Sequence, residues 1–407
     1  MEPATTVEVR SGRWILVGLC VASFLAALNF YAATPFYPRI ARDLETTVPL
    51  LGQVATLMIL ISAGLGLAVG PLSDRYGYRR PLVIGILAIA VNLVGTGLAP
   101  AYPVLLVMGL AGGLGDALVF SIPLAIAGVM FAGDVQRRAM GWIIGSLGIA
   151  PIVGIPVLTT IGGFAGWRAA LVAAGLAAVL AGWFVATVIP PDGQRPSSPF
   201  RVRQLLAAYA PLLAHPPTLR LYGATALRAV TWIGFLTYLG AFLDDQIGLG
   251  TRQIGLFYTV GGIGYAAGSV AAGGRLHLGA PRNVVALGCL IGSVAVGSML
   301  SVHDAWLFVA FLVVASVASA VSGIAIAALL ATESPAGSGT TMVLNGSVLN
   351  LGSAVGTALG GSLIAAGGYH ALALGLPLFG LIAVGLALWP AGDRNSGASG
   401  GRALPRC

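Results

Sequence analysis

The sequence predicts an all-α integral membrane protein, with 12 transmembrane helices in two six-helix bundles. Three observations lead to this class. Of the 407 residues, 57% are hydrophobic and only 8% are charged, whereas about a quarter of the residues in a soluble domain are charged. Apolar segments of about 20 residues, the length that crosses a bilayer, recur along the chain. The longest polar stretch follows the sixth segment and divides the chain into two halves.

The twelve apolar segments account for most of the chain. Segments four, ten and eleven are longer than one crossing requires, so we expect them to tilt or to extend beyond the bilayer. The segments cover approximately residues 14–36, 48–70, 81–99, 103–131, 140–163, 169–189, 218–243, 252–273, 283–301, 305–331, 339–366 and 370–389.

The long polar stretch has the composition of a linker. It begins with Pro-Pro-Asp-Gly and contains Arg-Pro-Ser-Ser-Pro, and both patterns are typical of loops. Its later part, residues 200–213, mixes arginines with leucines and is compatible with a short helix on the membrane surface. The expected units are an N-terminal bundle (1–189), a cytoplasmic linker (190–217), a C-terminal bundle (218–389) and a cytoplasmic tail (390–407).

The basic residues predict the orientation, and all 21 of them are arginines. With a cytoplasmic N-terminus, sixteen arginines fall on the inner side, four on the outer side, and Arg228 within segment seven. Inner loops of membrane proteins are enriched in basic residues, so we expect both termini in the cytoplasm and the protein in the inner or plasma membrane. Residues 1–12 have no apolar signal-peptide core, so the first segment is expected to remain as an anchor. Arginines scattered among loops do not make the basic face of a nucleic-acid-binding protein.

Glycines spaced four residues apart occur in segments two, five, eight and eleven. Small residues at this spacing let two helix backbones approach closely. The recurrence suggests a three-helix repeat used four times, although chance matches are expected among 59 glycines, and segments four and nine also contain the spacing. The pairs are Gly66 and Gly70, Gly141 and Gly145, Gly264 and Gly268, and Gly352 and Gly356, the last continued by Gly360.

A motif stands between segments two and three, where residues 70–81 read Gly-Pro-Leu-Ser-Asp-Arg-Tyr-Gly-Tyr-Arg-Arg-Pro. Its acid can accept hydrogen bonds from a helix N-terminus, and its arginines can bind helix C-termini or anionic headgroups. A purely topological role of the arginines is the alternative. The Asp-Arg-x-Gly-x-Arg-Arg order resembles the signature loop of the major facilitator superfamily, and residues 274–282 resemble a shortened second copy without the acid. We expect a conformational gate formed by Gly70, Asp74, Arg75, Gly77, Arg79 and Arg80.

Two further segments narrow the resemblance. Residues 150–156, Ala-Pro-Ile-Val-Gly-Ile-Pro, followed by Gly-Trp-Arg at 166–168, are similar to the twelve-helix drug:proton antiporter branch. Residues 350–361 resemble the sugar-efflux members of that branch. The resemblance implies the major facilitator fold and export of a small organic molecule by alternating access, coupled to protons. Prolines kink a helix and small residues permit close helix approach, so the two halves are expected to meet at Pro151, Gly154, Pro156, Gly352 and Gly356. Ordinary packing inside one half is the alternative.

Two positions depart from the branch. Gly109 stands where segment four normally has an arginine, and Asn29 stands where the first helix of many drug antiporters has an acid. Both charged groups are often associated with proton coupling. An uncoupled facilitator or an importer on the same fold is therefore the alternative function.

Two charges lie near the middle of segments, Asp116 in segment four and Arg228 in segment seven. Each would cost on the order of 3 kcal/mol at the bilayer centre if it faced lipid, so both are expected to face a watery cavity or each other. Asp116 is then a candidate proton or cation carrier, and Arg228 its partner or an anion anchor. A static ion pair, or an Arg228 that reaches to the membrane surface, is the structural alternative. Weaker candidates for the same cavity are Asn29, Trp232, Asn345 and Asn350.

Other classes of protein are not supported by the sequence. The four histidines lie near segment ends without metal-ligand spacing, and Asp116 is the only carboxylate well inside a segment, so no catalytic pair is available to an enzyme. The three cysteines lie far apart and indicate neither a disulfide framework nor a metal site. No repeated filter of a channel is visible. The expected partners are a small-molecule substrate, membrane lipid and protons; we expect a monomer without a cofactor.

Overall fold

The computed structural model describes residues 6–191, 209–273, 280–335 and 337–389, except for the side chains of residues 6–11, 70–72, 74–76, 137, 273 and 338. Within these residues the chain is helical and contains no β-strand, which confirms the predicted all-α class. Residues 209–213, at the end of the expected surface helix, are helical. The rest of that expected helix, most of the linker and the tail lie outside the described residues.

The first part of the chain forms an N-terminal group of helices that pack mainly with one another. α4 contacts α5 and α7, α5 also contacts α3, and α1 contacts α5, α6 and α7. The group consists of α1 (Thr6–Tyr31), η1 (Thr34–Phe36), α2 (Tyr37–Asp43), α3 (Val48–Tyr76), α4 (Arg79–Leu98), α5 (Tyr102–Met130), α6 (Gly133–Ile149), η2 (Ala150–Gly154) and α7 (Ile155–Val188).

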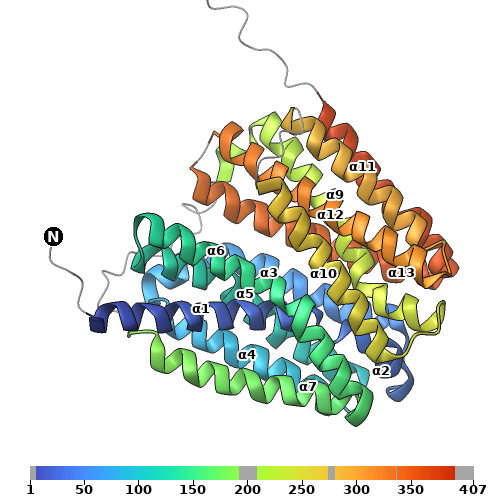
Figure 1. Cartoon of the computed structure of the whole chain (residues 1–407), viewed down its shortest axis with the longest axis horizontal. Helices are drawn as coiled ribbons and strands as arrows, with labels where there is room; N and C mark the ends of the chain where they lie inside the picture. Colours follow the sequence, from blue (N-terminus) through green and yellow to red (C-terminus); the bar gives the residue numbers. More distant parts are fainter. Residues whose placement is uncertain (1–5, 192–208, 274–279, 336, 390–407) are drawn as a thin grey trace, which may run out of the picture.

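The second part forms a C-terminal group. α13 packs along α9 and α11, and α12 packs along α10 and α11. Figure 1 shows the two groups as separate bodies, with the C-terminal one above. Its helices are α9 (Pro216–Asp245), α10 (Thr251–Gly273), α11 (Pro281–Met299), α12 (Ala305–Glu333) and α13 (Ser338–Leu388).

Among the described residues, ten helical stretches are long and apolar enough to cross a membrane. Two of them contain a break in the helical backbone. In α7 the break is at Gly166, with φ +85°, and in α13 it is at Gly367 and Gly368, the latter with φ +65°. Such positive φ values strain any residue with a Cβ, so glycine allows the chain to turn at these points.

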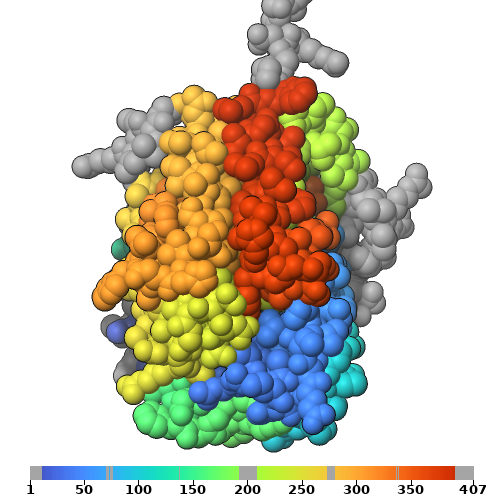
Figure 2. All heavy atoms as spheres, turned by 90° about the vertical axis from the view of Figure 1, so that its right-hand side faces the viewer, coloured from blue at the N-terminus to red at the C-terminus, as the bar shows by residue number. Residues whose placement is uncertain are grey.

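The two groups meet along α3 and α13 on one side, and along α10 with α7 and η2 on the other. The short η1 and α2 add contacts to α9. In Figure 1 the groups converge on the right, where α2 lies, and their helices diverge towards the left. Figure 2 looks onto the right-hand side, where blue and green atoms of the N-terminal group abut yellow and red atoms of the C-terminal group. We call this the α2 end of the molecule.

Candidate functional site

A chain of polar side chains is buried inside the N-terminal group around Asp116. The carboxylate of Asp116, on α5, is 1% exposed and accepts a hydrogen bond from Asn29 Nδ2 on α1 at 2.9 Å. The other half of that amide, Asn29 Oδ1, accepts from Asn92 Nδ2 on α4 at 2.8 Å. Thr96 Oγ1 donates to Asn92 Oδ1 at 3.5 Å. We call Asn29, Asn92 and Asp116 the Asp116 cluster.

Glycines on α5 make this cluster possible. A Cβ on Gly112 would lie 2.8 Å from the Asn92 side chain, and one on Gly113 would lie 2.5 Å from a backbone oxygen of α3. One on Gly115 would lie 2.9 Å from the Gly85 oxygen of α4. The helix therefore approaches both neighbours at backbone distance, and Asp116 comes within reach of Asn29, which accepts from Asn92. At Gly109 a Cβ would lie 3.2 Å from Val54 Cγ1, so a larger residue there requires Val54 to shift.

A small cavity adjoins the cluster. It has a volume of about 50 Å³ and is lined by Asn29, Asn92, Thr34 and Thr96 among mostly apolar side chains. A buried water needs about 10–15 Å³ of such volume, so the cavity has room for a few waters and not for a drug-sized molecule. Because Thr34 belongs to η1, the cavity extends from the Asp116 cluster towards the α2 end.

Arg228 lies in a different place and has different partners from Asp116. Its guanidinium, on α9, is 9% exposed, and Nη1 donates to the backbone oxygen and the hydroxyl of Ser319 on α12, at 3.1 and 2.9 Å. The structural alternative of an ion pair with Asp116 is therefore absent among the described contacts, and the guanidinium is held inside the C-terminal group. The sequence gives the depth of both charges but not the direction in which each helix presents them.

The weaker candidates also separate. Trp232 lines a cavity beside Arg228, Asn345 accepts a hydrogen bond from Thr225 Oγ1 at 2.9 Å, and Asn350 is half-buried on α13. All three belong to the C-terminal group, whereas Asn29 joins Asp116 in the N-terminal group. The residues expected to share one cavity are thus divided between the two groups.

The gate motif spans the turn from α3 to α4. Gly70, Asp74 and Arg75 belong to α3, and their surroundings and side chains lie outside the described residues. Gly77 ends α3 with φ +81°, a value that favours glycine. Arg79 donates through Nη2 to the backbone oxygen of Ala186, near the end of α7, while Arg80 is exposed.

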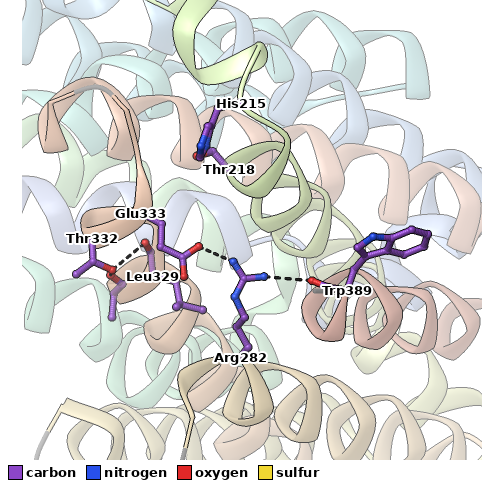
Figure 3. A network of polar contacts seen from close by, with 8 residues as sticks. His215, Thr218, Arg282, Leu329, Thr332, Glu333 and Trp389 are labelled. Atoms are coloured by element: carbon purple, nitrogen blue, oxygen red, sulfur yellow. Dashed lines mark hydrogen bonds and ion pairs between the residues drawn. The ribbon is translucent and has the colours of Figure 1, made fainter. Parts of the chain in front are cut away.

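The corresponding corner of the C-terminal group contains an ion pair (Figure 3). Arg282, the second residue of α11, donates through Nη2 to Glu333 Oε2 at 2.5 Å and through Nη1 to the Trp389 backbone oxygen at 3.4 Å. The acid that the 274–282 loop lacks is thus supplied by the last residue of α12. Arg79 and Arg282 make equivalent contacts. Each donates a hydrogen bond to a backbone oxygen at the C-terminal end of the last helix in its own group, where such oxygens lack helical partners.

Of the five residues expected between the two groups, the two prolines face α10. Ideal Cβ atoms on Gly262 and Gly255 of α10 would lie 3.4 Å from Pro151 Cβ and 3.3 Å from Pro156 Cα, respectively. Thr259, on the same face of α10, donates its hydroxyl to the Ile152 backbone oxygen at 3.1 Å.

The three glycines pack within their own groups, which corrects the expectation for them. A Cβ on Gly352 or Gly356 would lie 2.3 Å from a backbone oxygen of α9, and one on Gly154 would lie 2.8 Å from Leu28 of α1. Small residues indicate that two helices approach closely, but they do not indicate which two.

Several contacts close the α2 end between the groups. Arg42 lies 3.4 Å from Asp244 in an exposed ion pair, and the hydroxyls of Thr34 and Tyr258 are 3.0 Å apart. A Cβ on Gly240 of α9 would lie 2.8 Å from the Thr34 backbone oxygen. In contrast, ideal Cβ atoms on the following glycines of α3, α6 and α13 meet no atom within 4 Å: Gly64, Gly66, Gly141, Gly145, Gly148 and Gly346.

Three of these functional residues are missed by the sequence analysis. Asn92 carries the same signal as Asn29, an amide inside an apolar segment, and that signal could have found it. Thr259 and Glu333 carry none, because a threonine in a helix and an acid at a segment end are ordinary.

Two helix groups joined by close-packed helices, with buried polar groups inside an apolar shell, indicate a multi-pass membrane protein. The family model of the Major Facilitator Superfamily matches residues 19–276 and 221–405. The chain therefore belongs to the major facilitator superfamily, whose members carry small-molecule substrates across membranes.

Individual proteins that are similar to this chain are also transport or resistance proteins. The chain is 28% identical over 277 residues to a chloramphenicol resistance protein of Streptomyces lividans, covering 66% of this chain and 68% of that protein. It is 26% identical over 392 residues to the inner membrane transport protein YdhP of Escherichia coli O157:H7, covering 92% and 94%. A bacterial homolog of the human lysosomal transporter Spinster, solved in an inward-facing and occupied conformation, has the same fold, with a TM-score of 0.74, 16% identity and coverage of 92% and 96%.

Proposed function

We propose that the protein is a secondary active transporter that exports a small organic molecule by alternating access, with a proton carried by Asp116. The observation that carries the proposal is the burial of this carboxylate inside a membrane-spanning helix, bonded to the neutral amide of Asn29 and without a basic partner among the described residues. A buried acid without a cation is stabilised when it is protonated. It can therefore take up a proton on one side of the membrane and release it on the other, once its surroundings change.

Twelve spans are proposed for the topology, with both termini in the cytoplasm. The breaks at Gly166 and at Gly367–Gly368 divide two of the ten apolar stretches, and ten stretches with two divisions make twelve spans. In this topology residues 1–189 and 218–389 form the two halves, joined by 190–217 and followed by the tail 390–407. The α2 end then faces outward, which puts the Arg79 and Arg282 corners on the cytoplasmic side of the inner or plasma membrane.

During the conformational cycle, contacts between the two groups break at one end of the molecule and form at the other end. The α2 end is closed by contacts between the groups, while glycine faces of α3, α6 and α13 are open. Opening the α2 end would bring these bare helix faces together, because glycine allows close approach. Asp74 and Arg75 are proposed to hold the inner side in that second state.

The proposed substrates are moderately hydrophobic organic molecules such as antibiotics. Support comes from relatives named for resistance: the chloramphenicol resistance protein of Streptomyces lividans, and a tetracenomycin C resistance and export protein of Streptomyces glaucescens that is 26% identical over 175 residues. The mostly apolar helices would give a substrate pathway with hydrophobic walls, which suit such molecules. An uncoupled facilitator or importer remains the second candidate, favoured by Gly109 and Asn29, which carry no charge at positions of the coupling groups.

Labelled chloramphenicol in vesicles containing the purified monomer tests the proposal. We expect uptake into inside-out vesicles to exceed equilibrium when the interior is acidic, and to fall to equilibrium when the pH gradient is collapsed. Equal counterflow with and without the gradient would instead establish the facilitator. If chloramphenicol is not moved at all, the same assay with other labelled antibiotics separates a wrong substrate from a wrong mechanism.

A further inference from the structure

We propose that Arg228 anchors a binding site for a small monatomic anion, of which chloride is the probe, inside the C-terminal group. The proposal goes beyond transport of the organic substrate and does not depend on its direction. A cavity of about 20 Å³ lies against Arg228, and its lining residues all belong to α9, α11, α12 and α13. All of these helices belong to the C-terminal group.

Among the described residues, no acidic side chain is paired with Arg228. Ion pairs of the described residues are Arg42 with Asp244 and Arg282 with Glu333, and the partners of Arg228 are the neutral oxygens of Ser319. A buried charge is costly unless it is paired. An anion in the adjoining cavity removes that cost.

Two hydrogen-bond donors are available to such an ion. Arg228 Nε is buried and has no hydrogen-bond partner. Ser319 Oγ accepts from Arg228 Nη1, so its own hydrogen is free to donate into the cavity that it lines. An anion that accepts from both groups satisfies the unpaired donor as well as the charge.

Neighbouring hydroxyls do not compete for this role, because their hydrogens are already used. Ser322 donates to the Ser319 backbone oxygen at 3.1 Å, Ser293 to that of Cys289 at 2.7 Å, and Thr231 to that of Leu376 at 2.8 Å. The Cys289 thiol is the remaining weak donor on the wall. The wall offers no carboxylate that would repel an anion.

The size of the cavity decides the class of anion. A volume of about 20 Å³ holds one particle a little larger than water, since one water needs about 10–15 Å³. Chloride or bromide fits this space, whereas sulfate, phosphate and carboxylate substrates are too large. Glycine preserves the space, because a Cβ on Gly380 would lie 2.0 Å from Ser293 Oγ.

Thermal unfolding of the purified full chain tests the site. Gluconate is replaced by chloride at constant ionic strength, and we expect the Tm to rise with the logarithm of chloride concentration, by about 2 °C or more across the titration. Bromide should act like chloride, and sulfate should not. A Tm that is the same in chloride and gluconate would overturn the proposal and leave a water in the cavity.

Three variants assign the effect to the site. Arg228→Gln removes the charge and should abolish the chloride dependence, and Ser319→Ala should shift it to higher concentration. Arg252→Gln, which changes an exposed arginine of α10, should keep the full wild-type response. A full chloride response in folded Arg228→Gln would place the ion elsewhere and refute the site. If Arg228→Gln does not fold, Ser319→Ala and the anomalous scattering of bromide beside Arg228 Nε decide the question, and absence of both effects refutes the site.

Discussion

Thr259 and Ile152 are joined across the two helix groups because a proline leaves a carbonyl free. In an α-helix the Ile152 oxygen would accept from the N–H of the residue four positions later, but that residue is Pro156, which has no N–H. The backbone widens locally into η2, in which Ile155 N bonds to Ala150 O. Thr259 Oγ1 of α10 takes the free oxygen at 3.1 Å, and this bond exists only while the two helices are in contact.

Thr259→Val therefore should weaken the closed α2 end. The substitution keeps the shape of the side chain and removes the donor, which costs about 1 kcal/mol of the closed state and shifts its population about fivefold. Thr259→Ser, which keeps the hydroxyl, is the matched control. Spin-label distances across the α2 end measure the shift, and identical distance distributions in the two variants would contradict the role of the bond.

A cysteine pair should lock the α2 end. An ideal Cβ on Gly163 of α7 lies 3.9 Å from Arg252 Cβ of α10, close to the mean of about 3.8 Å for disulfides. In a chain without its three native cysteines, Gly163→Cys with Arg252→Cys should cross-link under mild oxidation and stop transport, and reductant should restore it. Each single cysteine is the control. Full transport by the cross-linked protein would show that this end does not open.

Asp116→Asn should separate coupling from folding. The amide resembles the protonated acid, so the variant is expected to fold and to bind substrate, but substrate movement should lose its dependence on the pH gradient. Asn345→Asp, which introduces an acid in the C-terminal group, controls for a general change of charge. A folded Asp116→Asn protein with wild-type dependence on the gradient would remove Asp116 from the proton pathway.

Glu333→Gln should lower stability modestly. The Arg282–Glu333 pair is 21% and 30% exposed at its two side chains, so solvent screens it and its loss should cost about 1 kcal/mol or less. Arg282→Gln should cost a similar amount, and the double variant should cost less than the sum of the two. Glu45→Gln, at an exposed acid, is the control. Strict additivity in thermal unfolding would show that the two residues do not interact.

Gly352→Ala should destabilise the C-terminal group in every conformation. Its new Cβ would lie 2.3 Å from the Ala226 oxygen, so α9 and α13 must move apart, at a cost of about 1–3 kcal/mol. Gly145→Ala is the matched control, because its Cβ meets open space and alanine favours a helix by about 1 kcal/mol. A Gly352→Ala protein with unchanged Tm and slowed transport would instead place Gly352 between moving halves.

The helical class was predictable because long apolar segments with few charges have no stable alternative in a membrane. Asp116 was predictable as a buried acid for the same reason. The hydrogen-bond partner of Asp116 was not predictable, because hydropathy indicates how deep a residue lies in the membrane but not which neighbouring helix its side chain faces. Asp116 accepts from Asn29, which in turn accepts from Asn92, within its own group, and Arg228 donates to Ser319 in the other. The prediction that Gly352 and Gly356 lie between the two groups was wrong for a similar reason, because the spacing of glycines does not indicate which helix they contact.

The contacts of Arg79 and Arg282 determine when each corner of the protein can form during synthesis and membrane insertion. Among the described contacts, Arg79 binds the end of α7, and Arg282 binds Glu333 and the end of α13. These contacts can therefore form as soon as the helices of the same group have left the ribosome and entered the bilayer. The amino-terminal half need not wait for the carboxy-terminal half to be translated, and two separately synthesised halves carry the contacts required to assemble into one transporter.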